Sequence, residues 1–305
     1  MELDYRSGHD GLRYWFSFGD VAGRFQLIDE RLESCKPARG KVKPFFYFGY
    51  ENGRPMLNVK GARRELRRED VHPEQSILAQ RKDPDQYPEI TWVAERLTQV
   101  RIYRDWSFGR FTPPRLPQPP DRPNNFLEED CRNLGLVLNR FRREPQAKLS
   151  FLEALDRLYQ GIDDFDVIVE GGTVQVFLQE DGRTIPATRL SDGTLRYLCL
   201  HAILLHPTPP PLVCLEEPEL GLHPDVLPFL ADLLRRASER MQIIVTTHSD
   251  TLVDAMTETP ESVVVCEKHD GATHLKRLDA SQLSEWLERY TLGQLWRKGE
   301  VGGNP

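Results

Sequence analysis

The sequence predicts an α/β protein with an antiparallel β N-terminal lobe, a helical insert and a parallel-sheet C-terminal lobe. Two patterns carry this prediction. The first sixty residues alternate apolar and polar side chains with the period of two that β-strands require. After Leu190, short apolar runs alternate with helical patterns, which is typical of parallel strands joined by helical crossovers. We place the three regions at residues 1–86, 87–163 and 164–305.

The N-terminal lobe reads as an antiparallel meander. The predicted strands are residues 12–18, 24–28, 44–50 and 56–59. Asn52-Gly53 lies between the last two, and this dipeptide favours a tight hairpin because both residues tolerate positive φ. The lobe therefore needs no helical crossovers.

The insert combines helices with a proline-rich stretch. A helical pattern begins at Tyr87, and residues 102–103 are a candidate short strand. Six prolines within residues 111–125 exclude a helix or a central strand, so an extended loop or linker is expected there. Further along, the predicted elements are helices 128–143 and 148–159 and strands 165–169 and 174–178.

The C-terminal lobe alternates strands with helices. The predicted helices are residues 194–206, 226–238 and 252–256, and the predicted strands are 212–215, 242–245 and 262–265. Ligands of such sheets bind beyond the carboxyl ends of the strands. The residues that follow each strand are therefore the first candidates for a site.

The composition excludes several classes of protein. Of 305 residues, 39% are hydrophobic and 29% are charged, which excludes a wholly disordered chain. The net charge of −7 argues against a strongly basic nucleic-acid binder. Residues 1–150 contain 27 basic and 22 acidic side chains, and residues 151–305 contain 13 and 25. The second half could hold a divalent cation, although most such charge is solvated surface.

The cysteines and the N-terminus favour a cytoplasmic protein. The five cysteines are widely spaced and include no Cys-x-x-Cys pair, which fits a reducing compartment. The N-terminus has no apolar signal segment, and the apolar run 197–205 is too short to span a bilayer. We expect no membrane association.

The first candidate site lies at the start of a predicted helix, in the segment 190–196. The Ser191 hydroxyl, the Gly193 backbone N–H and the helix N-terminus together form a cradle suited to a phosphate. An ordinary helix N-cap is the alternative interpretation.

Two further candidates follow apolar strands. Glu216 and Glu217 come directly after residues 211–215, and adjacent carboxylates there need a cation or water to satisfy them. His248 follows residues 242–245, a candidate central strand, and Ser249 or Asp250 can cap the next helix. The alternatives are a solvated strand end and a structural histidine.

These elements occur in one order and resemble a known family. LSDGTLR (190–196) resembles the signature motif of ATP-binding-cassette ATPases, LVCLEE (212–217) their Walker B strand, and TTHSD (246–250) their switch-histidine loop, with residues 218–224 in the D-loop position. The resemblance is to ABC-type ATPase heads of the SMC, RecF and OLD group, among bacterial AAA-type ATPase core proteins. It is specific over residues 185–270 and implies a P-loop NTPase fold.

The resemblance also implies roles for individual residues. Glu216 would hold Mg²⁺, and Glu217 would orient or deprotonate the attacking water. His248 would contact the γ-phosphate of ATP. Ser191 and Gly193 would bind the γ-phosphate of nucleotide held by the other protomer of a head-to-head homodimer. Such positioning and charge neutralisation are what phosphoryl transfer needs.

Gln80 is a candidate for the Q-loop glutamine of this family, and the alternative is a solvated glutamine. The sequence also departs from the family in two respects. Glu216 stands where many ABC ATPases have aspartate, although a carboxylate remains. The phosphate-binding pattern GxxxxGK[ST] occurs nowhere in the 305 residues, and Gly40-Lys41 lacks the first glycine and the final hydroxyl. We expect the missing loop upstream of Met1, with a natural half-site protein as the alternative.

The implied function is ATP hydrolysis to ADP and phosphate, and relatives suggest DNA transactions or phage defence by analogy only. One rival is an inactive regulatory or scaffold subunit that lends its signature motif to a partner protein. Another is a nuclease, for which Asp164 and Asp166 form a DxD pair. The arginine-rich stretches 63–68 and 140–143 are candidate DNA contacts or, alternatively, solvated faces. The apolar stripe at residues 286–296 indicates helical packing.

Overall fold

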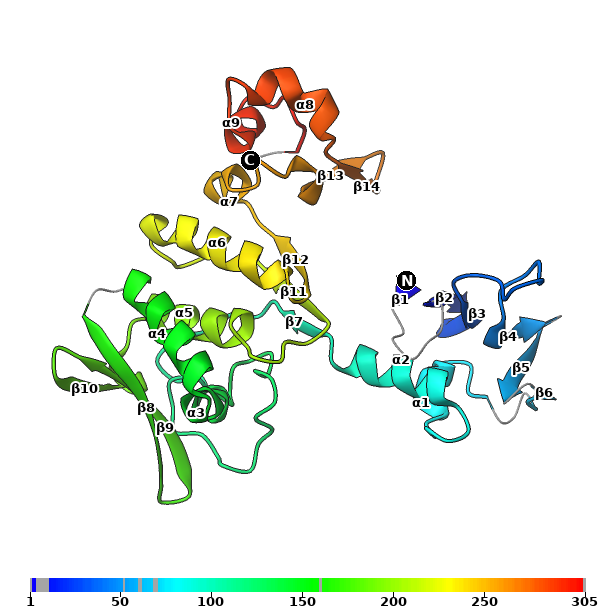
Figure 1. Ribbon diagram of the computed structural model, residues 1–305, viewed down its shortest axis with the longest axis horizontal. Helices are drawn as coiled ribbons and strands as arrows, with labels where there is room; N and C mark the ends of the chain where they lie inside the picture. The colour runs from blue at the N-terminus through cyan, green and yellow to red at the C-terminus, as the bar shows by residue number, and fades with distance from the viewer. Residues whose placement is uncertain are drawn as a thin grey trace. The chain divides into compact units, whose positions relative to one another are not determined.

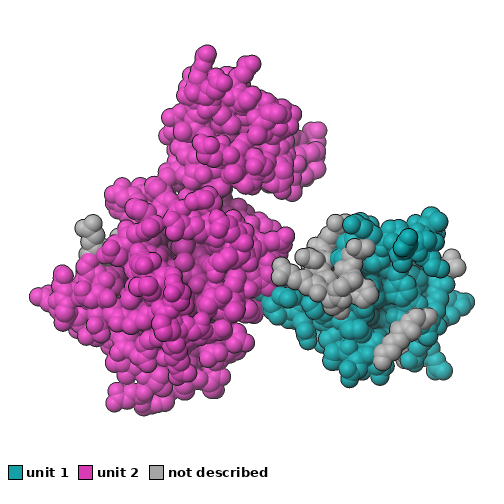
Figure 2. Space-filling view, viewed as in Figure 1, with its two compact units in different colours: residues 1–99 teal, residues 100–305 magenta. Residues whose placement is uncertain are grey.

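The computed structural model describes residues 2–3, 11–51, 53–59, 62–67, 71–158 and 161–303. Its contacts divide the chain into two compact units, Met1–Gln99 and Val100–Pro305, coloured separately in Figure 2. The helix at residues 88–98 belongs to the first unit by these contacts. The division of the chain into regions 1–86, 87–163 and 164–305 stays a prediction.

The first unit is an antiparallel sheet with two helices (Figure 1). Its strands, in sheet order, are β1 (Glu2–Leu3), β2 (Leu12–Val21), β3 (Arg24–Ser34), β4 (Phe46–Glu51), β5 (Arg54–Val59) and β6 (Ala62–Glu65), and its helices are α1 (Ile77–Gln80) and α2 (Pro88–Thr98). The turn between β2 and β3 places Ala22 and Gly23 at φ 56° and 78°, as a tight hairpin requires. Asn52, from the predicted Asn-Gly hairpin, lies outside the described residues, but β4 and β5 pair antiparallel as expected.

Among its described residues, the second unit contains three further sheets and the helices around them. In chain order it has β7 (Arg101–Tyr103), α3 (Leu134–Arg143), α4 (Pro145–Leu158), β8 (Ile162–Glu170), β9 (Thr173–Glu180), β10 (Arg183–Pro186), α5 (Asp192–Leu204), β11 (Leu212–Glu216), α6 (Leu227–Ser238), β12 (Gln242–Thr246), α7 (Asp250–Asp254), β13 (Val264–His269), β14 (Ala272–Arg277), α8 (Ala280–Leu287) and α9 (Leu292–Arg297). Strands β10-β9-β8 form an antiparallel sheet, and β12-β11-β7 form a parallel one. The predicted α/β class with antiparallel and parallel sheets is confirmed.

Helix α5 is buried from Leu195 to Leu204, and its apolar side chains belong to this unit's core. Leu195, Leu198 and Leu204 are fully buried in the same cluster as Val213 and Leu215 of β11. The side chains of β11 alternate, as a strand requires, so one face of the parallel sheet packs on this core. The core therefore fixes where the carboxyl end of β11 lies.

The parallel sheet differs from the prediction in two ways. The predicted strand 262–265 does not join it, because β13 pairs antiparallel with β14. The predicted central strand 242–245 is an edge strand, since β11 lies between β12 and β7. Parallel pairing is decided by which segments meet across the sheet, and an apolar run of four residues does not encode that.

One face of this sheet is uncovered within the second unit. Ile102, Cys214 and Ile244 lie in one row across the three strands. Ile102 is 46% exposed and Ile244 is 56% exposed. Parallel sheets normally carry helices on both faces, so this face and the β12 edge lack a covering layer among the described residues of this unit.

The proline-rich stretch is packed rather than a free linker. Gln118 is buried and forms a β-bridge with Val174 of β9. The predicted helix at 128–143 begins only at Leu134, because Cys131 has a positive φ of 59° and the Asn133 side chain accepts a hydrogen bond from the backbone of Glu128. The predicted end of the next helix, Tyr159, lies outside the described residues.

The stripe at residues 286–296 is split between α8 and α9. Thr291 starts α9 with a capping box, which separates the two helices. Leu292 and Leu295 are fully buried in a small cluster, whereas Trp286 remains 43% exposed. In the described part of the chain, no helix is long and apolar enough to cross a bilayer.

Candidate functional site

The two candidate carboxylates lie at the carboxyl end of β11, the middle strand of the parallel sheet. Glu216 ends the strand opposite Thr246 of β12 and is exposed. Glu217 leaves the strand with a φ of 43°, the left-handed region that few non-glycine residues occupy. Its backbone N–H donates to the Thr246 carbonyl at 2.9 Å, so the turn is tied to the neighbouring strand.

His248 lies beside Glu217. The distance from its Nε2 to the Glu217 Oε1 is 3.7 Å, and the His248 side chain is 74% exposed. The two strands end side by side, which is why residues 31 positions apart in the sequence meet here. The structure therefore brings a carboxylate and an imidazole together on an open surface.

Glu219 lies in the segment 218–224 that the sequence places in the D-loop position, but the sequence analysis assigned its side chain no role. Its side chain is 9% exposed, and its Oε1 accepts hydrogen bonds from the Thr247 hydroxyl and, at 3.3 Å, from the His248 backbone N–H. Its Oε2 is buried with no hydrogen-bond partner among the described residues. Glu219 thus holds the loop that carries His248. The signals in the sequence are its place in the segment 218–224 and its position two residues after Glu217.

Ser191 caps helix α5. Its Oγ accepts a hydrogen bond from the Thr194 backbone N–H at 3.0 Å, so the N-cap interpretation holds for this structure. Ser191 is also exposed, so the cap leaves its hydroxyl accessible. A side chain on Gly193 would place its Cβ 3.0 Å from the Gly221 carbonyl oxygen. A larger residue at 193 would therefore require the loop after Glu217 to shift by a few tenths of an ångström.

Arg115, from the proline-rich stretch, holds the start of α5 in place. It is 7% exposed and donates to the carbonyls of Leu190 and Phe108, the latter at 3.0 Å. It also forms an ion pair with Asp192. Sequence patterns do not identify this role, because Leu190 and Asp192 lie 75 and 77 positions from Arg115.

Arg196 links the same helix to the carboxylates. Its Nη1 donates to the Glu217 carbonyl at 3.2 Å, and its guanidinium lies over the rings of Trp106 and Phe108. Trp106 in turn donates from Nε1 to the Glu216 carbonyl at 2.8 Å. Burial lowers the pKa of Arg196, although an arginine stays protonated under ordinary conditions. Both glutamates therefore have their backbones fixed by aromatic and guanidinium groups.

Gln80 belongs to the first unit and ends α1. Its Oε1 accepts from the His72 N–H at 2.8 Å, and its Nε2 donates to the Gln75 carbonyl at 2.7 Å. Its amide is thus occupied by its own loop. A Q-loop role for Gln80 stays a prediction.

The carboxylates fit a magnesium ion only together with a phosphate ligand. Among the residues that the structure describes, no three His, Cys, Asp or Glu side chains gather into a metal site. Mg²⁺ commonly binds through one or two carboxylates, with waters and substrate phosphates as the other ligands. Glu216 and Glu217, both at the open end of β11, suit that kind of coordination.

Proteins similar to this chain are found both among sequence families and among solved structures. Residues 4–254 match the sequence profile of a family described as "AAA domain, putative AbiEii toxin, Type IV TA system". No protein of curated function matches the sequence. Among solved structures, an SMC head bound to the C-winged helix domain of ScpA is 15% identical over 86% of this chain and 71% of that chain, with a TM-score of 0.44.

Two further SMC structures are similarly distant. One, from structural biochemistry of the ATP-driven dimerization and DNA stimulated activation of SMC ATPases, is 18% identical over 51% of this chain and 95% of that chain, with a TM-score of 0.38. The SMC head domain from Thermotoga maritima is 14% identical over 87% and 74%, with a TM-score of 0.36. The family match spans most of the sequence, and on that ground the chain belongs to this family of AAA domains, the ATPase group that its three motifs resemble.

Proposed function

We propose that this chain is the head of an ABC-type ATPase that binds ATP with Mg²⁺ and hydrolyses it to ADP and phosphate. Glu216 holds the metal, which neutralises phosphate charge when bound. Glu217 accepts the proton of the attacking water, and His248 contacts the γ-phosphate. Ser191 and Gly193 bind the nucleotide of a second head, so the working form is a head-to-head dimer.

The pairing of Glu217 with His248 carries this proposal. Their side chains lie 3.7 Å apart at the ends of adjacent parallel strands, where α/β proteins bind ligands. The carboxylate can take a proton from water, and the imidazole can donate to a phosphate oxygen. Glu219, Arg196 and Trp106 hold the backbone around them, and such preorganisation is what phosphoryl transfer requires.

The phosphate-binding loop is the component that the 305 residues lack. The open edge of β12 and the exposed row at Ile102 and Ile244 leave space for one more strand and a covering helix. We propose that a strand followed by a phosphate-binding loop completes the sheet there, supplied by the same polypeptide or by a partner. The first check is the coding sequence upstream of the codon for Met1, where an in-frame GxxxxGK[ST] assigns the loop to the same polypeptide.

A second candidate follows from the same observation. Without a phosphate-binding loop of its own, the chain would be a half-site subunit that lends Ser191 and Gly193 to an intact ATPase. The exposure of Ser191 suits this role, because a hydroxyl used in trans must face the partner. An upstream sequence without the motif favours this candidate.

Two other ideas have less support. Asp164 and Asp166 form ion pairs with Lys148 and Arg142, which neutralise the carboxylates that a nuclease would need for metal. Arg63 likewise pairs with Glu51, as expected of a solvated face, and Arg68 lies outside the described residues. Coupling of ATP hydrolysis to DNA or to phage defence, and a cytoplasmic location, stay proposals.

Titration calorimetry with Mg-ATP is the direct test. The 305-residue chain alone should bind weakly and hydrolyse ATP near background, because the backbone N–H groups, lysine and hydroxyl of a phosphate-binding loop have no counterpart in the sequence. A form that includes the loop should turn ATP over, and Glu217→Gln in that form should abolish turnover while binding remains. Micromolar affinity with turnover by the chain alone would contradict the proposed need for the loop.

A further inference from the structure

A loop of the first unit carries a dense set of positive charges. It consists of residues 36–43, between β3 and β4 (Figure 1), and we call it the basic loop. All eight of its residues are exposed, and the sequence has no acidic residue between Ser34 and Tyr50. It joins two antiparallel strands, whereas a phosphate-binding loop leads from a strand into a helix. Its four cations are Lys36, Arg39, Lys41 and Lys43.

The backbone of the basic loop is held at its base and at its tip. At the base, the Ser34 N–H donates to the Phe45 carbonyl at 2.8 Å, and the Phe45 N–H donates to the Ser34 Oγ at 3.0 Å. At the tip, the Lys41 N–H donates to the Ala38 carbonyl at 2.9 Å. Gly40 has a φ of 80°, which glycine adopts at no steric cost. The loop is therefore one closed projection, with cations before, within and after its turn.

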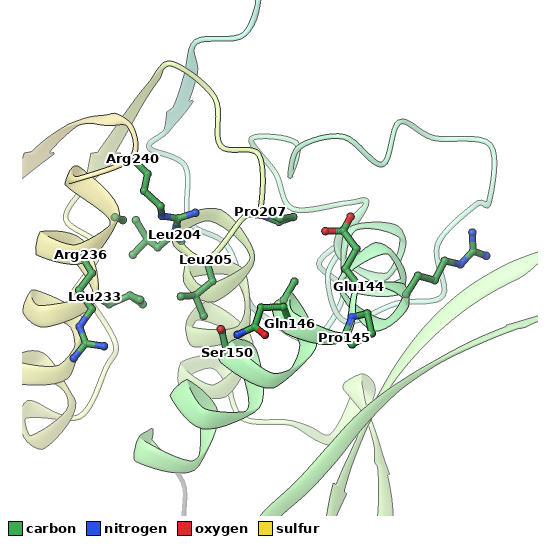
Figure 3. Close-up of a pocket in the computed structure, with 13 residues that line it drawn as sticks. Glu144, Pro145, Gln146, Ser150, Leu204, Leu205, Pro207, Leu233, Arg236 and Arg240 are labelled. Atoms are coloured by element: carbon green, nitrogen blue, oxygen red, sulfur yellow. Dashed lines mark hydrogen bonds between the residues drawn. The ribbon is translucent and has the colours of Figure 1, made fainter.

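The four cations of the basic loop are free to bind a ligand. Their side chains make no ion pair or hydrogen bond within the described part of the chain. The groove between α4, α5 and α6, shown in Figure 3, differs in this respect, because Arg236 pairs with Asp232 there and Arg240 donates to main-chain carbonyls. The described residues of the protein therefore leave the charge of the basic loop without a partner.

The arginine-rich stretches that the sequence suggested as DNA contacts also differ from the basic loop. Within them, Arg63 pairs with Glu51 and Arg142 pairs with Asp166. A phosphate that bound either guanidinium would have to compete with a carboxylate that is already in place. The cations of the basic loop face no such competition, so a polyanion can neutralise them directly.

Apolar anchors are scarce on the basic loop. An acidic peptide docks through apolar or aromatic anchors in a pocket, and an anionic membrane takes up apolar side chains beside the cations. Val42 is the one large apolar side chain at residues 36–43. Phe45, at the base, already contacts the Tyr47 ring edge-on, with centroids 5.0 Å apart. The loop therefore offers charge with little apolar surface, which favours a hydrophilic polyanion.

Among hydrophilic polyanions, duplex DNA matches the loop. Residues 36–43 include no aromatic ring on which unpaired bases would stack, and no hydroxyl or amide side chain for the 2′-OH groups of RNA. A DNA duplex needs only cations, because it carries one charge per roughly 1.7 Å of its axis. We propose that the basic loop binds the phosphate backbone of duplex DNA without selecting a sequence. Such a contact supplies the proposed coupling to DNA with a surface, and it does not rest on ATP hydrolysis.

DNA binding by the intact chain tests the proposal. The probe is a fluorescein-labelled DNA duplex of about twenty base pairs, in two unrelated sequences, and binding is followed by fluorescence anisotropy. Both sequences should bind with a Kd of about 1–10 μM at about 50 mM salt. The slope of log affinity against log salt concentration should lie near about −3.6, which is about −0.9 for each of four phosphates.

Two variants and a matched control locate the contact. Lys41→Gln removes one cation and should weaken binding about eightfold at about 0.1 M salt, with a slope shallower by about 0.9. The double variant Lys41→Gln/Lys43→Gln should have a slope shallower by about 1.8. Lys82→Gln, an equal charge change at an exposed residue of the same unit, should leave affinity and slope unchanged. Circular dichroism checks that each variant is folded.

Several results would overturn the proposal. These are no binding at protein concentrations up to about 1 mM, a slope that the double variant leaves unchanged, and equal losses in Lys41→Gln and Lys82→Gln. Tighter binding of a single strand or of an RNA duplex would also overturn it, as would binding to phosphatidylcholine vesicles with about 30% phosphatidylserine without binding to DNA. A changed oligomeric state of the double variant with DNA binding unchanged would show that the loop faces another copy of the chain instead. None of these measurements uses ATP, so failure here leaves the ATPase proposal untouched.

Discussion

Acidification should destabilise the protein through His201, a histidine buried in the last turn of α5. Its side chain is fully buried, and its Nδ1 hydrogen-bonds to the Tyr197 carbonyl oxygen at 2.9 Å. Burial disfavours the charged imidazole and lowers the pKa of His201 from 6.5 to about 4. The folded protein therefore keeps this ring neutral at pH values where the unfolded chain protonates it.

The sign and the magnitude follow from linkage. Between pH 6.5 and about 4 the unfolded chain binds more protons at His201, so the free energy of unfolding falls as the pH falls through this window. Each pKa unit corresponds to roughly 1.4 kcal/mol, and His201 accounts for a loss of about 2 kcal/mol between about pH 7 and pH 5. Burial also lowers the pKa of His206, which adds a loss in the same direction.

Comparison with a variant isolates the contribution of His201. Urea unfolding followed by circular dichroism should give a free energy of unfolding for the wild-type chain and for His201→Leu at each pH. The wild-type value should fall by about 2 kcal/mol more than that of the variant between about pH 7 and pH 5. His274→Gln, at an exposed histidine, should keep the wild-type slope. A His201→Leu slope equal to the wild-type slope would refute the reasoning.

Three further substitutions test contacts of the second unit by urea unfolding. Gly293→Ala should lower the free energy of unfolding by about 1–3 kcal/mol, because the added Cβ would lie 2.4 Å from the Asp250 carbonyl oxygen. The control Gly109→Ala should be near neutral, because no atom lies within 4 Å of the added Cβ. Equal effects of the two substitutions would contradict the close contact at Gly293. Arg115→Ala should lower the free energy of unfolding by about 3 kcal/mol or more, because it leaves buried carbonyls unpaired. A loss below about 1 kcal/mol would show that water replaces the guanidinium. Glu219→Ala should lower the free energy of unfolding by about 1–3 kcal/mol, because the loop that carries His248 loses its acceptor. Glu219→Gln keeps an acceptor oxygen and should lower it less. A larger loss for Glu219→Gln than for Glu219→Ala would contradict these hydrogen bonds.

Local chemistry explains what the sequence predicted well. A serine before a helical pattern caps α5 at Ser191, and apolar runs ending in polar residues are strands β11 and β12 with Glu217 and His248 after them. These features depend on residues within a few positions of one another. Period, caps and strand ends are therefore readable in order along the chain.

Long-range packing decided the remainder. The third strand of the parallel sheet is the three-residue β7, and the predicted third strand became part of the hairpin β13–β14. Arg115 meets Leu190 from 75 positions away, and Trp106 meets Glu216 from 110 positions away. Glu219 acquires its role only because β11 and β12 end side by side. A single sequence determines which segments are strands and helices, but the identity of distant partners depends on how the apolar faces bury one another, and that is settled only when the whole core packs.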